Sequence, residues 1–411
     1  MKKRLVVLAA MLTTLLTVSL PGALAGPAAE PGLTATSIKI GTTMPLSGSA
    51  SLYAPIASGM RAYFSYINSR KAASDNKRGV YGRQIVFKVE DDAYNPVQTA
   101  QQTRKLVEQD KVFALVGGLG TEQQQAVRQY LNQKKVPQIY VSTGAATWGK
   151  DHKNFKWTIG WQPDYTSEGI AYGNYVKANL PNAKVGVLYQ NDDYGKDYLF
   201  GFRSRAGARI VATQSYEPGA PSVSPQVAAL RASGADTFLV LAIPTPTIQA
   251  LVTAYRLGWK PNLIVNSVSA TDTFLTIARN SAGSPDAVNG IITTAYLKDP
   301  ASPKYAKDAQ VKRYKGWMDK YLPAANENNG LYYYGMAKAA DFVQALYRAG
   351  KQPTRASVMR AVENLSYKSP WVIPGSRVST TARNAFPIKY QRLTRYNNGS
   401  FTEFGRLQKI R

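Results

Sequence analysis

Few residues of this 411-residue chain could carry out covalent or acid–base chemistry. Cysteine is absent, so the chain has no thiolate nucleophile, no disulfide and no thiolate metal ligand. His152 is the single histidine, and a Ser–His dyad would depend on it alone. Because it lies in the polar stretch 150–154, we expect a solvated loop residue. No Gly-x-Ser-x-Gly, His-Glu-x-x-His, Walker A or Gly-x-Gly-x-x-Gly motif occurs.

Two pairs of adjacent carboxylates, Asp91-Asp92 and Asp192-Asp193, follow expected strands. Neighbouring residues of a strand point to opposite faces, so neither pair converges on one metal ion or one glycosidic bond. We therefore predict that the protein is not an enzyme and holds no metal or cofactor.

Binding chemistry is better represented, in two turns rich in glycine and hydroxyl groups. Residues 116–121 (VGGLGT) follow one expected strand and open a helix, and residues 141–147 (VSTGAAT) follow the next strand. Such turns present backbone N–H groups at a helix N-terminus, where the helix dipole stabilises a carboxylate. In open α/β sheets ligands bind beyond the carboxyl ends of the strands, where these turns lie.

The elements that position these turns alternate between short apolar strands and amphipathic helices. We expect strands at 37–42, 84–89, 112–116, 138–141, 184–189, 209–215, 237–242 and 263–266, and helices at 58–68, 96–109, 122–132, 195–205, 225–233 and 247–257. This alternation predicts an α/β fold of two consecutive doubly wound units with parallel sheets. Two later helices, 305–321 and 332–349, are expected to pack back on the first unit. Asn398-Gly399 predicts a hairpin near the C-terminus.

The N-terminus predicts export. Lys2, Lys3 and Arg4 precede an apolar run, and Ala23-Leu24-Ala25 supplies the small residues of a cleavage site. We expect a signal peptide over 1–25, because the run is too short to cross a bilayer. Without a cysteine there is no lipid anchor, so the mature protein is expected to be periplasmic or secreted.

The net charge of +26 suggests attraction to anionic surfaces. Lysine and arginine are spread along the whole chain without a run of five, which favours a dispersed basic surface over a nucleic-acid site. A secreted polyanion-binding protein remains an alternative, and we expect no nucleic-acid partner.

Several segments together resemble periplasmic solute-binding proteins of the branched-chain amino acid type. The resemblance starts with residues 41–48 (GTTMPLSG), and further matching segments follow in the family's order. These segments are Tyr53, Gly59, Ile67-Asn68, Gly82-Arg83, Asp91-Asp92, Asn95-Pro96, 117–121, 142–147 and 192–195 (DDYG).

The resemblance implies two doubly wound lobes joined by three crossing strands, which close on a small ligand. The first lobe would comprise 36–158 and 296–375, and the second lobe with the hinge 159–295 and 386–411. The crossings would fall near 157–160, 292–296 and 375–387. The protein would serve an ATP-driven (ABC) importer as a monomer that docks on membrane permease subunits. A module that passes its signal to a separate membrane receptor is the other alternative.

The resemblance also implies which residues bind the ligand. A carboxylate would be held at Leu119, Gly120 and Thr121 and by the loop Gly144, Ala145, Ala146 and Thr147. Tyr53 would cap the mouth, and Tyr194 would close from the second lobe. The remaining expected ligand residues are Trp161, Thr245, Ser267 and Val268.

Val268 departs from the family pattern, because it falls where the family places the acid that binds the ligand's ammonium group. An ammonium buried opposite valine would be unpaired, which costs several kcal/mol. Either Asp272, four residues later, replaces that acid or the ligand has no ammonium. Aromatic residues at 148, 157, 161, 165 and 332–334 favour a flat or apolar body. We therefore expect an amino acid-like or aromatic carboxylate.

Overall fold

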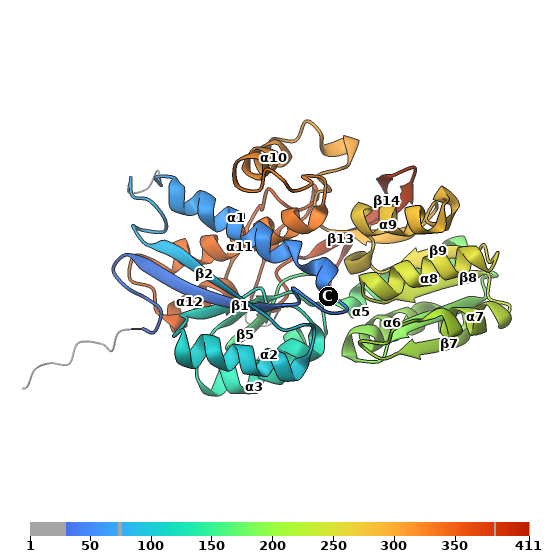
Figure 1. Ribbon diagram of the computed structural model, residues 1–411, viewed down its shortest axis with the longest axis horizontal. Helices are drawn as coiled ribbons and strands as arrows, with labels where there is room; N and C mark the ends of the chain where they lie inside the picture. Colours follow the sequence, from blue (N-terminus) through green and yellow to red (C-terminus); the bar gives the residue numbers. More distant parts are fainter. Residues whose placement is uncertain (1–29, 73–75, 382–383, 411) are drawn as a thin grey trace, which may run out of the picture.

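Two β-sheets, each covered by helices on both faces, organise the chain into two lobes that lie side by side (Figure 1). The computed structural model describes residues 30–72, 76–381 and 384–410. The signal peptide expected at 1–25 lies outside these residues. We call the part around the five-stranded sheet the first lobe and the part around the seven-stranded sheet the second lobe.

The first lobe contains a fully parallel sheet with strand order β2-β1-β3-β4-β5. Its strands are β1 (Ser37–Met44), β2 (Gln84–Asp91), β3 (Ala114–Val116), β4 (Gln138–Val141) and β5 (Thr158–Gly160). Its helices are α1 (Pro55–Ser69), α2 (Pro96–Arg104), α3 (Thr121–Gln133), α4 (Thr147–Lys150), α10 (Ala309–Tyr321), α11 (Gly330–Ala349) and α12 (Arg355–Glu363). Helices α1 and α11 lie on one side of the sheet, and α2 and α3 on the other (Figure 1).

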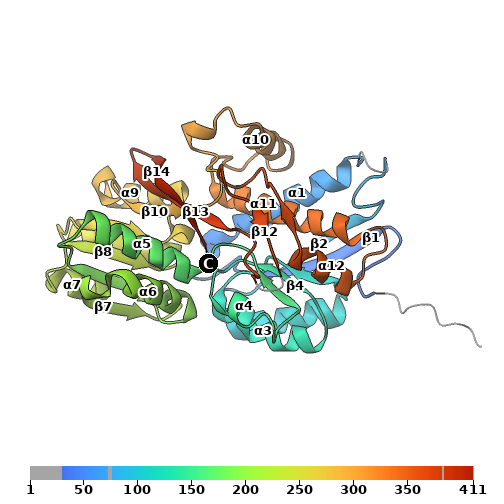
Figure 2. The same ribbon diagram turned by 180° about the vertical axis from the view of Figure 1, so that it is seen from behind.

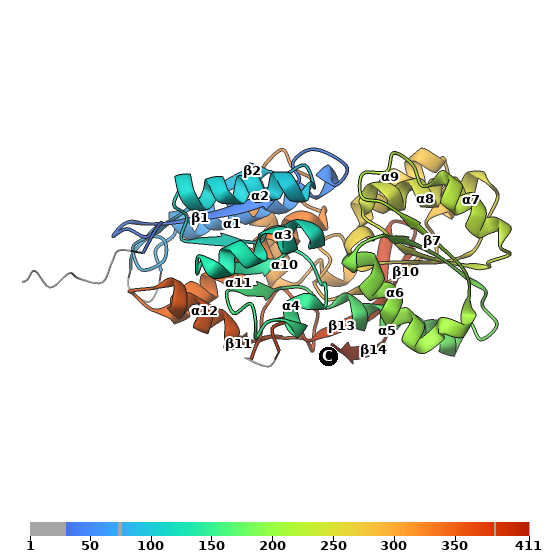
Figure 3. The ribbon, with the colours of Figure 1, turned by 90° about the horizontal axis from the view of Figure 1, so that it is seen from below.

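The second lobe contains a mixed sheet with strand order β14-β13-β10-β9-β8-β6-β7. Its strands are β6 (Val185–Gln190), β7 (Ile210–Tyr216), β8 (Thr237–Leu241), β9 (Asn262–Val265), β10 (Ile292–Ala295), β13 (Tyr390–Asn397) and β14 (Ser400–Lys409). Its helices are α5 (Tyr165–Asn179), α6 (Asp193–Ala206), α7 (Ser224–Ala232), α8 (Pro244–Arg256) and α9 (Asp272–Ala282). Seen from below, α5 and α6 lie on one side of this sheet and α7, α8 and α9 on the other (Figure 3).

This architecture confirms the predicted α/β fold of two doubly wound lobes. One feature of the second sheet was not predicted. Strand β13 pairs antiparallel with β10, so that sheet is mixed and not fully parallel. The turn of the hairpin reverses the chain, so β14 in turn pairs antiparallel with β13. The late helices do pack on the first lobe, where α11 lies along α1 (Figure 2).

The chain passes between the lobes three times. It crosses after β5, after β10 and between the short strand β12 (Val378–Ser379) and β13; β12 pairs with β11 (Ser366–Tyr367). Residues 157–160 and 292–296, where crossings were expected, largely form strands of the sheets, and the chain changes lobe directly after them. The C-terminal end of β14 lies near the junction of the lobes (Figure 3).

Side-chain caps fix several helix starts beside the interlobe region. Asn95 accepts hydrogen bonds from the amides of Val97 and Gln98 at the start of α2. Asp192 accepts one from the Gly195 amide and so begins α6. Such caps satisfy N–H groups that have no partner inside the helix. The Asp pairs of the sequence are therefore structural: Asp91 in turn accepts hydrogen bonds from Leu46, Ser47 and Ala93.

His152 is buried, with 5% of its surface exposed, so the expectation of a solvated loop histidine was wrong. Its Nδ1 lies 2.9 Å from the Thr158 carbonyl and its Nε2 3.0 Å from Glu363 Oε1. Both partners are acceptors, so only the doubly protonated ring satisfies both. The hydrogen bond to Glu363 accordingly raises the pKa of His152 above its ordinary value.

The pH dependence of stability should report this contact. A raised histidine pKa adds stability that is complete below the unfolded-state value of about 6.5 and is lost as pH rises through the folded-state value. We expect His152→Gln to cost about 1 kcal/mol of unfolding free energy at pH 5.5 and clearly less at pH 8.5. Urea unfolding of both proteins at the two pH values measures this difference. A cost that does not change with pH would contradict the assignment.

Candidate functional site

A cavity of about 170 Å³ lies between the lobes and is lined by residues of both lobes and of the segments that connect them. The first lobe contributes the turns that follow β3 and β4 and the starts of α1 and α11. The second lobe contributes the turn after β9 and strands β10 and β13. The carboxyl ends of the strands thus border the cavity, as in other open α/β sheets.

Hydroxyl groups of the first lobe form one wall of the cavity. Thr121, Ser142 and Thr143 line it, and the Thr121 and Thr143 hydroxyl oxygens lie 2.6 Å apart. Thr121 is the first residue of α3, whose N-terminal amides favour an anion. Gly120 has φ +100°, and a Cβ there would stand 2.1 Å from Gln123 Oε1. Glycine at this position therefore allows the turn to bring Thr121 to the wall.

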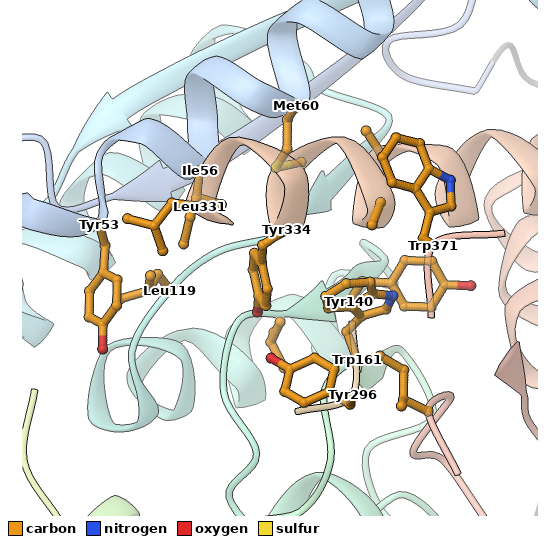
Figure 4. Packing of buried hydrophobic residues seen from close by; sticks show 14 of the residues in the cluster. Tyr53, Ile56, Met60, Leu119, Tyr140, Trp161, Tyr296, Leu331, Tyr334 and Trp371 are labelled. Atoms are coloured by element: carbon orange, nitrogen blue, oxygen red, sulfur yellow. The ribbon is translucent and has the colours of Figure 1, made fainter. Parts of the chain in front are cut away.

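Tyrosine rings are the most frequent aromatic groups in the lining. Those in the lining are Tyr53, Tyr94, Tyr165, Tyr194, Tyr296, Tyr333 and Tyr334. Figure 4 shows Tyr53 beside Leu119 and Tyr334 beside Tyr296. Tyr165 contacts Tyr194 edge-on at a centroid distance of 5.1 Å. Burial raises the pKa of Tyr194 and Tyr334 well above the ordinary value, so both are neutral phenols. The wall can pack against an apolar or aromatic body and offers neutral hydrogen-bonding groups.

The opposite wall, in the second lobe, contains Ser267 and Val268. The amide and hydroxyl of Ser267 donate to buried Glu168 at 2.7 and 2.9 Å, which fixes this turn. Val268 places an apolar side chain on this wall. Asp272 does not line the cavity, and its Oδ1 accepts a hydrogen bond from the Tyr396 hydroxyl at 2.8 Å. Among the described residues of the lining, Asp299 is the one acid, and burial raises its pKa to about 6.

Several hydrogen bonds between described residues join the lobes around the cavity, and four of them involve side chains at its edge. The Tyr53 hydroxyl donates to the Val268 carbonyl at 3.1 Å, and the Ala146 amide donates to Asp197 Oδ2 at 2.7 Å. The other two run from Gln125 Nε2 to Asp193 Oδ2 at 2.9 Å and from Gln190 Nε2 to the Tyr94 hydroxyl at 3.3 Å. We call these four contacts the lip contacts.

The structure brings seven of the predicted ligand residues to the cavity and places six elsewhere. Those in the lining are Tyr53, Leu119, Gly120, Thr121, Tyr194, Ser267 and Val268. Those outside it are Gly144, Ala145, Ala146, Thr147, Trp161 and Thr245. The Ala146 amide is engaged by Asp197, and the Thr147 hydroxyl donates to Asp151 at 2.6 Å. Trp161 Nε1 donates to buried Asp341 at 2.7 Å.

Several lining residues were not among the predicted ligand residues. Tyr94 lies between β2 and α2, Gln162 follows β5 and Tyr296 follows β10. Each therefore lies in a separate connection. Gln162 accepts a hydrogen bond from the Tyr334 hydroxyl at 2.7 Å and thereby links the connection after β5 to α11. Their common signal is position: each lies just beyond the carboxyl end of a strand.

Among the residues that the structure describes, no helix combines the length and apolar character needed to span a membrane.

Two α/β lobes with a polar-and-aromatic cavity between them are the architecture of two-lobed binding proteins. The chain belongs to the family described as periplasmic binding protein, whose model matches residues 37–400. This result confirms the resemblance drawn from the sequence.

The individual relatives have low sequence identity to this chain. An amino acid binding protein of Pseudomonas aeruginosa is 23% identical over 284 residues, 68% of this chain and 72% of that protein. Leu/Ile/Val-binding protein homolog 7 of Brucella abortus is 25% identical over 242 residues. That alignment covers 56% of this chain and 58% of the Brucella protein, so the chain spans little more than half of that relative.

A solved structure of similar fold is the solute binding protein of an ABC transporter from Rhodopseudomonas palustris BisB5 in complex with 3,4-dihydroxy benzoic acid. The two share 19% identity with a TM-score of 0.74, over 91% of this chain and 98% of the other.

Proposed function

We propose that this protein is the extracytoplasmic solute-binding component of an ABC importer, which captures a small carboxylate with an apolar or aromatic body. The observation that carries the proposal is the cavity itself. Its first-lobe wall offers hydroxyl groups at a helix N-terminus, whereas Val268 offers no charge to an ammonium group. Asp299, the one acid of the described lining, already accepts a hydrogen bond from the Ala301 amide, and burial raises its pKa to about 6. Seven tyrosines also line the cavity. An aromatic or aliphatic acid fits this arrangement better than a zwitterionic amino acid does.

The relatives support the proposal at the level of chemical class. Proteins named for leucine, isoleucine and valine and a structure with a bound aromatic acid share this fold or family. All of these ligands carry a carboxylate, and they differ in whether an ammonium accompanies it.

In the proposed cycle, the ligand docks on the first lobe and the second lobe rotates in. Only a ligand that binds the closed form more tightly shifts this equilibrium. The closed protein, a monomer without catalytic activity, then docks on permease subunits after export and signal-peptide removal. The proposed hinge lies where the chain passes from one lobe to the other. In this division the first lobe comprises 36–158 and 296–375, and the second lobe with the hinge comprises 159–295 and 386–411.

Calorimetric titration tests the proposed ligand class. The panel consists of benzoate, phenylacetate, 4-methyl-2-oxopentanoate, leucine and valine, added to refolded, ligand-free protein. We expect the ammonium-free acids to bind more tightly than leucine, because leucine would bury an unpaired ammonium beside Val268. Tight leucine binding together with weak binding of 4-methyl-2-oxopentanoate, which has the same carbon skeleton, would overturn the ammonium-free assignment.

Two threonine variants test where the carboxylate docks. Thr121→Ala removes a hydroxyl from the cavity wall, and we expect binding to weaken by about 1–2 kcal/mol because carboxylate hydrogen bonds are lost. Thr147→Ala is the matched control, since Thr147 lies outside the lining. It should leave affinity unchanged. The reverse result would place the carboxylate at the loop 144–147, which the sequence predicted as a second part of the carboxylate site.

A further inference from the structure

Lys338 is a lysine buried without a counter-charge next to the proposed ligand site. It lies on α11, one turn after the lining residue Tyr334, and none of its surface is exposed. Its Nζ donates to the Ser142 hydroxyl oxygen, and Ser142 in turn donates to the Gly117 carbonyl at 2.6 Å. Nζ also lies 4.3 Å from the centroid of the Tyr334 ring and 5.4 Å from that of Trp161.

No carboxylate among the described residues forms an ion pair with Lys338. Asp341, three residues later on α11, already accepts hydrogen bonds from Trp161 Nε1 and the Tyr367 hydroxyl. Other titratable groups around this region include the phenols of Tyr334 on α11, Tyr140 on β4 and Tyr165 on α5, whose pKa burial raises in each case. Burial correspondingly lowers the pKa of Lys338 well below its usual range.

Lys338 lies close enough to the cavity to interact with an anion bound there. Ser142 and Tyr334 both line the cavity, and Lys338 lies directly behind them (the surrounding rings are seen in Figure 4). A buried ammonium is costly unless an anion accompanies it. An anion on the hydroxyl wall would stand one side chain away from Nζ, in surroundings that screen charge poorly.

We propose that Lys338 is the counter-ion of the ligand's carboxylate, and that it takes up a proton when the carboxylate docks at Thr121 and Thr143, beside Ser142. This inference rests on the proposed function and deepens it: the site selects anions through a cation that is created by binding. A neutral analogue of the same shape gains nothing from Lys338.

The direction of the pH effect follows from linkage. Ligand binding raises the pKa of Lys338 from its depressed value in the free protein, so the complex holds more protons than the free protein between the two values. Affinity for a carboxylate therefore falls as pH rises through this window, by up to about tenfold per pH unit. Among the described residues, two other charged groups line the cavity. Asp299, with a pKa of about 6, is ionised at pH 8, where Lys338 is tested, and Lys298 is already paired with Asp308 at 2.7 Å.

The first experiment uses the unmodified protein. Benzoate, phenylacetate and 4-methyl-2-oxopentanoate are each titrated calorimetrically at pH 8 in phosphate and in Tris, whose ionisation enthalpies differ. We expect an uptake of up to one proton per bound ligand. Binding without proton uptake overturns the role of Lys338 and leaves the proposed function intact. If none of the acids binds, both fall.

Lys338→Met keeps the volume of the side chain and removes its charge. We expect proton uptake to vanish and benzoate affinity at pH 8 to fall about tenfold, with benzamide binding unchanged. Lys389→Met is the matched control, because burial lowers the pKa of Lys389 to about 8 and its Nζ donates to the Phe386 carbonyl away from the lining. It should retain proton uptake. Uptake that persists in Lys338→Met, or is lost in Lys389→Met alone, contradicts the proposal. Should Lys338→Met fail to fold, the proton count of the unmodified protein still decides.

Discussion

Gly335→Ala is expected to lower the free energy of unfolding by about 2–3 kcal/mol, because α1 and α11 cross with their backbones in contact. A Cβ at Gly335 would stand 2.2 Å from the Ile56 carbonyl oxygen and 3.0 Å from the Met60 amide nitrogen. Gly59 is the counterpart on α1, where a Cβ would stand 2.4 Å from the Tyr332 carbonyl oxygen. No rotamer change relieves a clash with backbone atoms, so the helices must separate.

Urea unfolding monitored by circular dichroism measures this loss. Gly316→Ala is the matched control: Gly316 lies within α10, and no atom falls within 4 Å of an added Cβ. That variant should gain up to about 1 kcal/mol, as alanine does over glycine in a helix. Because the starts of α1 and α11 border the cavity, Gly335→Ala should also weaken ligand binding. Equal stabilities of the two variants would show that the crossing tolerates a methyl group.

Val268→Glu is the second change with a large expected effect. It adds a carboxylate to the cavity wall opposite the hydroxyl groups, where it repels a ligand carboxylate and attracts an ammonium. We expect benzoate to bind about 30–100-fold more weakly, and the preference for 4-methyl-2-oxopentanoate over leucine to reverse. The backbone contact from Tyr53 to the Val268 carbonyl does not depend on this side chain.

Val268→Gln separates charge from size. Glutamine has nearly the same shape as glutamate, so it should weaken all ligands alike without reversing the order. Competitive calorimetry with 4-methyl-2-oxopentanoate and leucine measures which of the two binds more tightly in each variant. If Val268→Glu and Val268→Gln change the ligand affinities identically, a charge at position 268 does not reach the ligand. Val268 then does not decide whether the ligand carries an ammonium group.

Much of the fold could be predicted because its signals are local. Strands such as β3, β4 and β8 are short runs buried along their whole length, which is the pattern of a parallel sheet between helices. Errors occur at element ends: a helix expected from 305 begins at Ala309, because Asp308 caps it. The side of the sheet that receives β13 depends on tertiary packing and left no local signal.

The site could be predicted only in part, because it is made by contacts between lobes. The loop 144–147 has the composition of an anion site, yet Asp197 of the other lobe occupies the Ala146 amide. The sequence does not reveal which donors such a contact uses. Lys338 was missed for a related reason. Its burial follows from the packing of α11 against the turns at Gly117 and Ser142, and not from any motif.

The lip contacts have a consequence for how such a protein could be tuned. None of them requires a ligand, so their strength contributes to how often the empty protein is closed. Weakening one that lies outside the cavity lining, as in Gln125→Ala, would alter that resting balance and shift the apparent affinity for every solute by a common factor. The ratio between two solutes would depend on the cavity wall alone. The affinity for solutes and the selectivity between them can therefore change independently in this architecture.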